Sequence, residues 1–407
     1  MPGDCLRAAV VGGSIAGLMS GLLLCRAGWR VDIYERAPEP LNGRGAGIVT
    51  HEELFEVLRL AGISIDENLG VQVRLRRMFD GKGKLILETH RDQLVTSWDR
   101  LFELMRGSFP DEHYHRGKML TRVETLKDGV RAEFADGTAA EADLLIGADG
   151  FRSSVRAQFL PRVRPIYAGY VAWRGLVDEA TLSPQTHREI FETLAFSLPP
   201  QGQVLGYPVP GHGEDLRPGH RRYNFVWYRP ADETELKNLL TDSTGQSHPI
   251  SIAPPLIRSE IIAGVRRASE AVLAPQFAEV VRLTKSPFFQ PIYDLEAPKM
   301  VFDRCVILGD AAFVARPHVA AGVTKAAFDA LSLQRALVKQ PNDIPAALLA
   351  FEGPRLAVGW RIVNRGRELG AYIQPQQKSQ QERDLADLHH TPHAVMVETA
   401  DLSFLAT

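Results

Sequence analysis

Cysteine is scarce in this sequence, which has 3 cysteines among 407 residues. Cys5, Cys25 and Cys305 lie far apart, form no C-x-x-C pair and leave an odd count. A disulfide framework and a cysteine-based zinc site are therefore excluded, because both need clustered cysteines. Widely spaced thiols are typical of a reducing compartment, so we expect a cytoplasmic protein.

An excess of basic charge and long apolar runs are also missing. The 47 Lys and Arg residues against 49 Asp and Glu residues give a formal net charge of -2. Nucleic acid is therefore disfavoured as the main partner, since phosphate binding requires a basic excess. No stretch is long and apolar enough to span a bilayer, and no basic amphipathic helix is present to hold the chain on one. We expect small-molecule partners, with neither nucleic acid nor membrane among them.

Metal-ligand spacing is absent as well. His389, His390 and His393 lie close together, but no cysteine or acidic residue accompanies them at a fixed spacing. We therefore predict no metal site. The last 35 or so residues are weakly patterned and are expected to form a docked or frayed tail.

The N-terminus does carry a nearly complete dinucleotide-binding fingerprint. An apolar strand over 6–11 leads into Gly12-Gly13-Ser14-Ile15-Ala16-Gly17, where Ser14 replaces the middle glycine of G-x-G-x-x-G. Helical spacing continues toward Gly28, and a second strand over 31–35 ends in Glu35. The helix N-terminus can face a diphosphate, and an acid at this place accepts hydrogen bonds from ribose hydroxyls. The fingerprint alone leaves FAD and NAD open.

Two further apolar strands each end in a glycine and an aspartate. Residues 142–147 lead into Ala148-Asp149-Gly150, and residues 305–308 lead into Gly309-Asp310. Glycine lets the main chain pass close to a bound dinucleotide, and each aspartate offers a hydrogen-bond acceptor. Arg316-Pro317-His318 then precedes a helix expected to begin near Gly322. The N-terminus of that helix directs free N–H groups and its positive end at whatever lies before it.

In this order, the three motifs resemble the group A, single-component flavoprotein aromatic hydroxylases, the para-hydroxybenzoate hydroxylase-like family. The resemblance is close over about 6–60, 100–175 and 285–340, looser between these segments, and absent from the tail. Within the family, three stretches are most similar to the dihydroxypyridine hydroxylases: Tyr167–Gly175, Tyr207–Gly211 and Arg316–His318.

The resemblance implies an α/β fold. It consists of a Rossmann-like FAD-binding domain of the GR2 type, an inserted and mainly β-sheet substrate domain, and a C-terminal helical segment. We expect the FAD-binding domain to comprise residues 1–72, 100–165 and 285–340. The substrate domain would comprise 73–99 and 166–284, and the C-terminal helix and tail 341–407.

The activity implied by the resemblance is that of an FAD-dependent monooxygenase. With NADH or NADPH and O2, the reduced flavin of the family forms a C4a-hydroperoxide that hydroxylates a small electron-rich ring, here of the hydroxypyridine type. Other functions on the same scaffold stay open: a flavin oxidase or dehydrogenase, a decarboxylating hydroxylase of another phenol, and a flavin-binding regulator without turnover. A homodimer or a monomer is expected.

The resemblance also assigns residues to the cofactor. Glu35 and Arg36 would hold the adenosine ribose, and Leu120 would lie under the adenine. Asp149 would lie near the pyrophosphate and the nicotinamide route, and Asp310 at the ribitol. The complete predicted cofactor-binding set is Gly12, Gly13, Ser14, Gly17, Glu35, Arg36, Arg44, Leu120, Asp149, Gly309, Asp310, Gly322 and Val323.

The sequence departs from the family pattern in three places. Phe313 replaces the histidine that follows Gly-Asp-Ala-Ala, and Ala321-Gly322-Val323 replaces Gly-Gln-Gly, so close contacts to the flavin ring would differ. Trp98 stands where many relatives carry an arginine on the helix that flanks the cofactor. Arg44 either supplies the missing charge or is a solvated loop arginine.

Hydroxylation of a ring that carries a hydroxyl group would be helped by a base poised near neutral pH, and histidine is the natural type. His51 follows a strand end expected near the ring system, and His318 precedes the flavin-facing helix. Each is alternatively a hydrogen-bonded structural histidine. Tyr207, Trp227 and Tyr228 lie on strands expected to roof the pocket, as core residues or, for a tyrosine, to orient a ring oxygen. The predicted catalytic set is His51, Tyr207 and His318.

Overall fold

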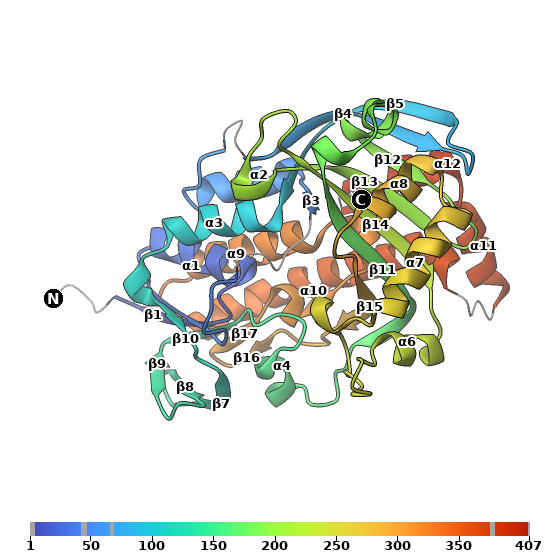
Figure 1. The fold of residues 1–407 in the computed structure, drawn as a ribbon. Coiled ribbons are helices and arrows are strands. Elements are labelled where there is room, and N and C mark those ends of the chain that lie inside the picture. Colours follow the sequence, from blue (N-terminus) through green and yellow to red (C-terminus); the bar gives the residue numbers. More distant parts are fainter. Residues whose placement is uncertain (1–4, 42–46, 66–68, 375–378, 406–407) are drawn as a thin grey trace.

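Two β-sheets lie beside each other and are covered by helices in this computed structural model (Figure 1). The structure describes residues 5–41, 47–65, 69–374 and 379–405. One sheet has six strands, lies near the N-terminus and packs against the long helices α1, α9 and α10. The other has nine strands and packs against α7 (Ser259–Val272) and α8 (Pro275–Leu283). Bounds of the three long helices are Ile15–Arg26 for α1, Gly322–Lys339 for α9 and Ile344–Leu369 for α10.

The six-stranded sheet is parallel except for one edge strand. Its order is β16-β17-β10-β1-β2-β6, and only β16 pairs antiparallel. The inner strands are apolar runs buried on both faces, as expected where helices and a second layer cover a parallel sheet. The strands are β1 Arg7–Val11, β2 Arg30–Glu35, β6 Tyr114–Arg116, β10 Leu144–Gly147, β16 Val301–Phe302 and β17 Cys305–Ile307. A three-stranded antiparallel sheet packs against β1 and β10 and consists of β7 Leu120–Thr125, β8 Val130–Phe134 and β9 Ala139–Ala142.

This topology brings three loops from distant parts of the sequence to one edge of the sheet. The strands β1, β10 and β17 are parallel neighbours, so the loops at their carboxyl ends lie next to each other. Those loops begin at Gly12, Ala148 and Leu308. In open parallel sheets, ligands bind outside the carboxyl ends of such strands. The three sequence motifs therefore meet at one place.

The nine-stranded sheet is antiparallel except for the β12–β4 pair. Its order is β18-β15-β11-β14-β13-β12-β4-β5-β3. The sheet unites the two segments predicted for the substrate domain, and it also contains β3, β15 and β18, which lie in segments predicted for the FAD-binding domain. The domain boundaries themselves stay a prediction. The strands are β3 Gly47–Val49, β4 Val71–Phe79, β5 Leu85–Ser97, β11 Ile166–Asp178, β12 Thr193–Ser197, β13 Gln203–Val209, β14 Arg222–Pro230, β15 Phe288–Glu296 and β18 Phe313–Val314.

The two faces of this sheet serve different cores. Successive side chains of a strand point to opposite faces. On β11, Val171, Trp173 and Val177 pack in a core with α7 and α8, whereas Tyr170 and Ala172 belong to a second core on the other face. The second face is the one that turns toward the six-stranded sheet and its loops, and the candidate site lies there.

The break between two neighbouring helices coincides with a proline. The helices α7 and α8 are separate because the chain turns at Leu273 and Pro275 begins the second helix. The tail is docked and contains α11 and α12. Remaining helices are α2 Glu52–Leu60, α3 Trp98–Ser108, α4 Ser154–Phe159, α5 Pro184–Thr186, α6 Glu233–Leu239, α7 Ser259–Val272, α8 Pro275–Leu283, α11 Gln380–His389 and α12 Pro392–Glu398.

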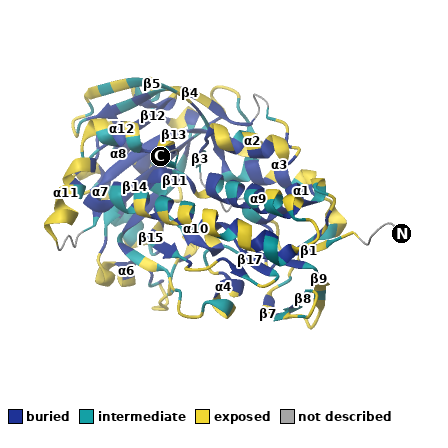
Figure 2. Cartoon of the chain, turned by 180° about the vertical axis from the view of Figure 1, so that it is seen from behind, coloured by how far each residue is buried: buried dark blue, intermediate teal, exposed yellow. Residues whose placement is uncertain are grey.

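Buried residues are gathered in the strands of both sheets and on the inner sides of α1 and α9, while α11 and the outer part of β5 are largely exposed (Figure 2). Within the described ranges, none of the helices has both the length and the apolar character needed to cross a membrane.

Candidate functional site

The loop between β1 and α1 has a main-chain path that only glycine permits. Gly12 has φ +105, and a Cβ built on it would lie 2.4 Å from the carbonyl oxygen of Ala148. A Cβ on Gly17 would lie 1.9 Å from the carbonyl oxygen of Gly12. Ser14 is the N-cap of α1, and its side chain makes no capping hydrogen bond. The loop thus presents main-chain N–H groups and a free hydroxyl at the N-terminus of a helix, an arrangement that suits a phosphate.

Glu35 fixes this loop against the end of β2. It is buried, and its carboxylate accepts the main-chain N–H groups of Gly13 and Ala37, each at 2.8 Å. Tyr114, from β6, donates its hydroxyl to the carbonyl of Gly13 at 2.8 Å. Burial raises the pKa of Tyr114 to about 12, so its hydroxyl stays a donor. Each Glu35 oxygen keeps acceptor capacity for a ligand hydroxyl, because a carboxylate oxygen accepts about two hydrogen bonds.

The remaining residues assigned to the adenosine end lie in different settings. Arg36 is exposed next to Glu35. Leu120 begins β7 and is buried in the core of the six-stranded sheet. Arg44 lies outside the described residues. The binding roles of all three stay predictions.

Asp149 has a buried carboxylate oxygen with no partner. Its Oδ2 accepts the N–H groups of Ser154 at 2.6 Å and Val155 at 3.2 Å, at the start of α4. Its Oδ1 is buried and has no hydrogen-bond partner among the described residues. Burial raises the pKa of this carboxyl group. An unsatisfied buried acceptor costs about 1–3 kcal/mol, so this atom suits a donor from a bound ligand.

Asp310 stands where the loop after β17 meets the first turn of α9. Its side chain is 53% exposed and lines the cavity described below. The ammonium Nζ of Lys325 lies 4.0 Å from Asp310 and 3.9 Å from Asp329. Lys325 is only 1% exposed, and its Nζ has no hydrogen-bond partner within the described part of the chain. Asp329 in turn accepts from the Gly309 N–H at 3.0 Å and from Arg355 at 2.7 Å.

Sequence analysis missed Lys325. The only signal for it is a lysine among small residues near the start of a buried helix. Gly322 begins α9, and its N-cap residue Ala321 supplies no side-chain cap. The helix end therefore keeps uncapped N–H groups facing the cavity, and a buried cation lies on the same turn. Both features favour negative charge in front of the helix.

A cavity of about 510 Å³ lies between the loops of the six-stranded sheet and one face of the nine-stranded sheet. One side of it is formed by Asp310, Gly322 and Val323, with Gly47–Val49 and Trp98 beside them. The facing wall belongs to the nine-stranded sheet and contributes Arg174, Leu194, Leu205, Tyr207, Val226, Tyr228, Gln290 and Ile292. The C-terminal segment supplies Thr399 and Ala400. A largely apolar cavity with a few polar groups is the usual form of a small-molecule site.

Two of the three predicted aromatic roof residues line this cavity. Tyr207 and Tyr228 are on the wall, and Tyr207 packs on Gly47, where an added Cβ would lie 2.6 Å from the ring. Trp227 points to the opposite face and belongs to the core with α7 and α8, because it neighbours Tyr228 on the same strand. Burial raises the pKa of Tyr207 well above its ordinary value and that of Tyr228 to about 12. Both phenols are therefore neutral donors.

The two predicted catalytic histidines lie beside the cavity rather than on its surface. In the described part of the chain, neither His51 nor His318 is among the residues that line it. The Nδ1 of His51 lies 3.1 Å from the hydroxyl of Thr324, on the first turn of α9. Burial lowers the pKa of His51 to about 4 and that of His318 to about 3, so both rings are neutral at pH 7. A role for either as a base stays a prediction.

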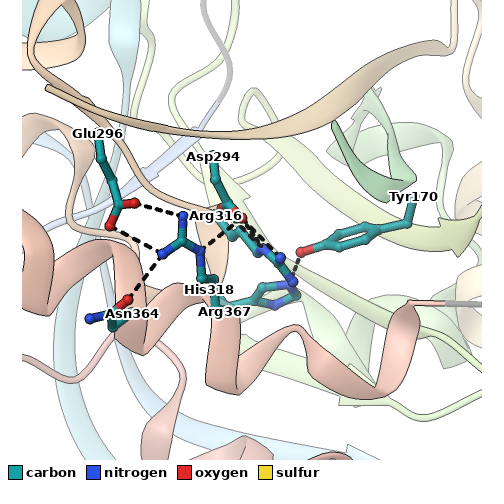
Figure 3. Close-up of polar contacts among 7 residues, drawn as sticks. All are labelled: Tyr170, Asp294, Glu296, Arg316, His318, Asn364 and Arg367. Atoms are coloured by element: carbon teal, nitrogen blue, oxygen red, sulfur yellow. Dashed lines mark hydrogen bonds and ion pairs between the residues drawn. The ribbon is translucent and has the colours of Figure 1, made fainter. Parts of the chain in front are cut away.

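His318 belongs to a buried polar cluster that fixes the loop before α9 (Figure 3). Its Nε2 lies 2.9 Å from the hydroxyl of Tyr170 on β11. The neighbouring Arg316 forms an ion pair with Asp294 on β15 at 2.9 Å. Arg367 of α10 joins Asp294 at 3.2 Å. The cluster also includes Glu296 and Asn364, which accept from Arg367. These bonds tie β15, the loop and α10 together, and thereby position the loop along the cavity.

The structure shows the surroundings of two residues that depart from the family pattern, Trp98 and Phe313. Trp98 lines the cavity and stacks on Phe102, with ring centroids 4.9 Å apart. Phe313 is buried against α10, where a Cβ on Gly359 would lie 2.5 Å from its ring. The ring at position 313 therefore serves packing. Ala320, just before α9, has a left-handed φ of 50, a strained conformation of the kind found at functional sites.

The histidines of the tail have protein partners. His389 lies 2.7 Å from a carboxylate oxygen of Glu398, and His390 stacks on Tyr372 with centroids 4.4 Å apart. Among the described residues, no three or more His, Cys, Asp or Glu side chains form a group that could hold a metal ion.

The tail itself is fixed by an arginine that sequence analysis did not single out. Arg76, on β4, is 1% exposed. Its guanidinium donates to Gln93 at 2.6 Å, to the Thr399 carbonyl at 2.8 Å and to the Met396 carbonyl. The Ala400 N–H donates to the carbonyl of His318 at 3.1 Å. These contacts hold the segment after α12 against the cavity.

The donor set suits a dinucleotide that carries a ring system. The glycine loop leaves no room for side chains, Ser14 and the α1 N–H groups face the phosphate position, and Glu35 can accept from a ribose. Asp149 offers an orphaned acceptor, and Asp310 opens into the cavity. FAD fits this order of groups.

Comparisons with known proteins give matches over nearly the whole chain. A family model described as FAD binding domain-like matches residues 167–294. The 2,6-dihydroxypyridine 3-monooxygenase of Paenarthrobacter nicotinovorans is 34% identical over 370 residues, covering 90% of this chain and 91% of that protein. The structure of 2,6-dihydroxypyridine-3-hydroxylase from Arthrobacter nicotinovorans matches with a TM-score of 0.85 and 32% identity, covering 93% of this chain and 96% of that one. Klebsiella pneumoniae HpxO, solved with FAD and uric acid, matches with a TM-score of 0.79 and 23% identity over 100% of this chain and 98% of that one, a likeness of fold alone.

Proposed function

Since the chain belongs to the FAD-dependent aromatic monooxygenases of the para-hydroxybenzoate hydroxylase-like class, we propose that it hydroxylates a small ring of the hydroxypyridine type. The co-substrates are NADH or NADPH and O2. The supporting observation is the cavity of about 510 Å³, which joins Asp310 and the start of α9 to a tyrosine-bearing sheet face. The relative that matches 90% of the chain is named for a dihydroxypyridine, which supports the ring class.

The residues at the carboxyl ends of the parallel strands hold the cofactor in this proposal. Gly12, Gly13, Gly17 and Ser14 accommodate the pyrophosphate. Glu35 accepts hydrogen bonds from the ribose hydroxyls, and Arg36 helps to hold the adenosine ribose. Leu120 supports the adenine, Asp149 stands by the pyrophosphate, and Gly309 and Asp310 hold the ribitol. Gly322 and Val323 contribute main-chain N–H groups to the edge of the flavin. When bound, FAD reduced by the nicotinamide supplies the activated oxygen.

The sheet face positions the substrate. Leu194, Leu205, Val226 and Ile292 exclude water from the cavity and contact the ring faces. Tyr207 and Tyr228 keep their protons and donate to a ring oxygen. His51 and His318 act from behind the cavity surface as positioning residues, one through Thr324 and the other through Tyr170. We propose a monomer or homodimer that works in the cytoplasm.

The test is hydroxylation by the FAD-loaded protein. Purified protein reconstituted with FAD should show a bound-flavin absorption spectrum, and 2,6-dihydroxypyridine should stimulate the oxidation of NADH or NADPH. With isotopically labelled O2, the product should gain one labelled oxygen atom by mass spectrometry. Hydroxybenzoates serve as matched ring controls.

Three outcomes would contradict the proposal. Nicotinamide oxidation with an unchanged ring would indicate an oxidase or dehydrogenase. Bound flavin that never turns over would indicate a regulator. Failure to bind FAD would remove the basis of the proposal. Light scattering on the same preparation measures whether the protein is a monomer or a homodimer.

A further inference from the structure

One arginine of the cavity wall has no hydrogen-bond or ion-pair partner among the residues that the structure describes. Arg174 is on β11, two residues beyond Ala172 and four beyond Tyr170, on the face that turns to the cavity. It lines the cavity together with Tyr207 and Tyr228 from the next strands of the sheet. Its Nε is buried without a hydrogen-bond partner. Across the described residues, its guanidinium takes part in no hydrogen bond or ion pair.

Each of the other three charged side chains that line the cavity has an interacting partner among the described residues. Arg152, at the mouth, donates to the hydroxyl of Ser251. Arg316 is paired with Asp294 at 2.9 Å. Asp310 lies 4.0 Å from Lys325. Arg174 therefore differs from its charged neighbours, since its positive charge faces the cavity without compensation from the protein.

An uncompensated guanidinium in a mostly apolar cavity is costly, and an anionic ligand with hydrogen-bond acceptors would relieve the cost. Arginine is suited to this task because its planar fork of N–H donors stays charged at any physiological pH. The two tyrosines add neutral hydroxyl donors on the same wall. The wall therefore offers a cation and two hydrogen-bond donors, and it supplies no negative charge of its own.

We propose that Arg174 binds the substrate ring through a negatively charged oxygen and selects rings that carry an acidic hydroxyl over neutral isosteres. Tyr207 and Tyr228 complete the oxygen site. The inference rests on the proposed function, and it narrows the substrate to the anion of a hydroxylated aromatic or heteroaromatic ring. An opposite charge within about 4–6 Å favours the ionised form of a group and lowers its pKa by about 1–3 units. Arg174 then keeps the ring hydroxyl deprotonated without a protein base.

The test uses a ligand whose colour reports its charge. 4-Nitrophenol ionises with a large change in visible absorption, and 4-nitroanisole is its neutral isostere. In FAD-loaded protein, bound 4-nitrophenol should show an apparent pKa lowered by about 1–3 units relative to the free compound. The protein should also bind 4-nitrophenolate at least about tenfold more tightly than 4-nitroanisole. Arg174→Met should abolish both effects, and Arg174→Lys should keep part of them.

A matched control comes from the same sheet. Arg229 lies on β14 over the ring of Trp227, 4.8 Å from its centroid, and faces the opposite core. Arg229→Met removes the same charge from the sheet and should leave the pKa of the bound probe unchanged. Arg174→Gln serves as the second variant if Arg174→Met does not retain FAD, and the same loss is expected.

The results separate this inference from the proposed function. An unshifted probe pKa in the wild-type protein, or an equal shift in Arg174→Met or Arg174→Gln, would overturn the role of Arg174 even if hydroxylation occurs. A shift that depends on Arg174 would uphold that role. Absence of hydroxylation by a protein that shows the shift would instead overturn the proposed reaction.

Discussion

The two halves of the site are built in different ways. At the carboxyl ends of the parallel strands, the site is formed mainly by main-chain atoms. Gly12 and Gly17 allow a ligand to approach the main chain closely, and helix N-termini present N–H groups. On the nine-stranded sheet, single side chains such as Arg174, Tyr207 and Tyr228 define the wall, and each comes from a different strand. A main-chain site needs a fixed local sequence, whereas a side-chain wall needs only the correct face of each strand.

The ion pair behind the side-chain wall should give the largest loss of stability. Asp294→Asn keeps the volume of the side chain but removes the negative charge that Arg316 and Arg367 share. Breaking a buried pair in this way costs about 3–5 kcal/mol, because the charge of Arg316 stays buried without its partner. Urea unfolding of the two proteins measures the difference.

An exposed pair provides the control for that experiment. Glu260 is 64% exposed and lies 3.2 Å from Arg258. Glu260→Gln should change the free energy of unfolding by no more than about 1 kcal/mol. Equal effects of the two substitutions would show that the cluster around Asp294 does not fix the loop before α9.

In the main-chain half, one added methyl group should strongly weaken the binding of FAD. Gly17→Ala places a Cβ 1.9 Å from the carbonyl oxygen of Gly12, so the loop must move. Overpacking of this kind costs about 1–3 kcal/mol, and we expect FAD affinity to fall by about 100-fold. Fluorescence titration with FAD measures it. Gly107→Ala, in α3, meets no atom within 4 Å and should bind FAD like the wild type.

Acid should lower the free energy of unfolding, because His318, which packs behind the side-chain wall, is buried as a neutral ring. Its folded pKa of about 3 lies below the ordinary 6.5, so the unfolded chain takes up a proton as the pH falls through 6.5 while the folded ring stays neutral. Stability is therefore highest above pH 6.5 and falls toward pH 3, by about 1.4 kcal/mol per unit for one group. Between pH 6.5 and 5 the loss is about 2 kcal/mol. His318→Asn should lose this part of the acid dependence in urea unfolding, and an unchanged slope would contradict the burial of a neutral ring.

The smallest effect is expected for the buried cation beneath α9. Lys325→Met keeps the length of the side chain and removes the charge beside Asp310. We expect about tenfold weaker FAD binding, equal to about 1.4 kcal/mol, with little change in the melting temperature of the cofactor-free protein. Lys285→Met, at a lysine whose side chain is 85% exposed, provides the charge control. Unaltered FAD affinity would remove Lys325 from the cofactor site.

The secondary structure of the main-chain half could be predicted because its signals are local, while the binding roles of its residues stay predictions. The strand before Gly12, the helix from Ile15 and the strand that ends in Glu35 all have their pattern within a few residues of each other. The two aspartate loops follow apolar strands in the same way. Their assembly at one sheet edge follows from the parallel order of the strands, and the FAD-dependent hydroxylase class is confirmed by the relative that covers 90% of the chain.

The side-chain half was harder to predict, because its geometry depends on register. A shift of one residue moves a side chain to the other face of a sheet. Tyr228 lines the cavity and Trp227 does not, although both belong to one aromatic run. Arg174 is part of a motif that was recognised for its resemblance, but only the pairing of β11 with β14 and β15 brings it to the cavity face. The docking of the tail depends on Arg76, more than 300 positions earlier in the chain.

The C-terminal segment after α12, which Arg76 holds, closes one side of the cavity. Every residue assigned to FAD lies at or before position 325, whereas Thr399 and Ala400 form part of the wall of the cavity. A molecule cut between α10 and α12 would keep the complete cofactor set and lose one side of its reaction chamber. In such a molecule the flavin site would be open to water, and we would expect the electrons of NADH or NADPH to reduce O2 to hydrogen peroxide without hydroxylation of the ring. The cavity is therefore closed only when the C-terminal segment is in place, although that segment holds none of the residues assigned to the cofactor.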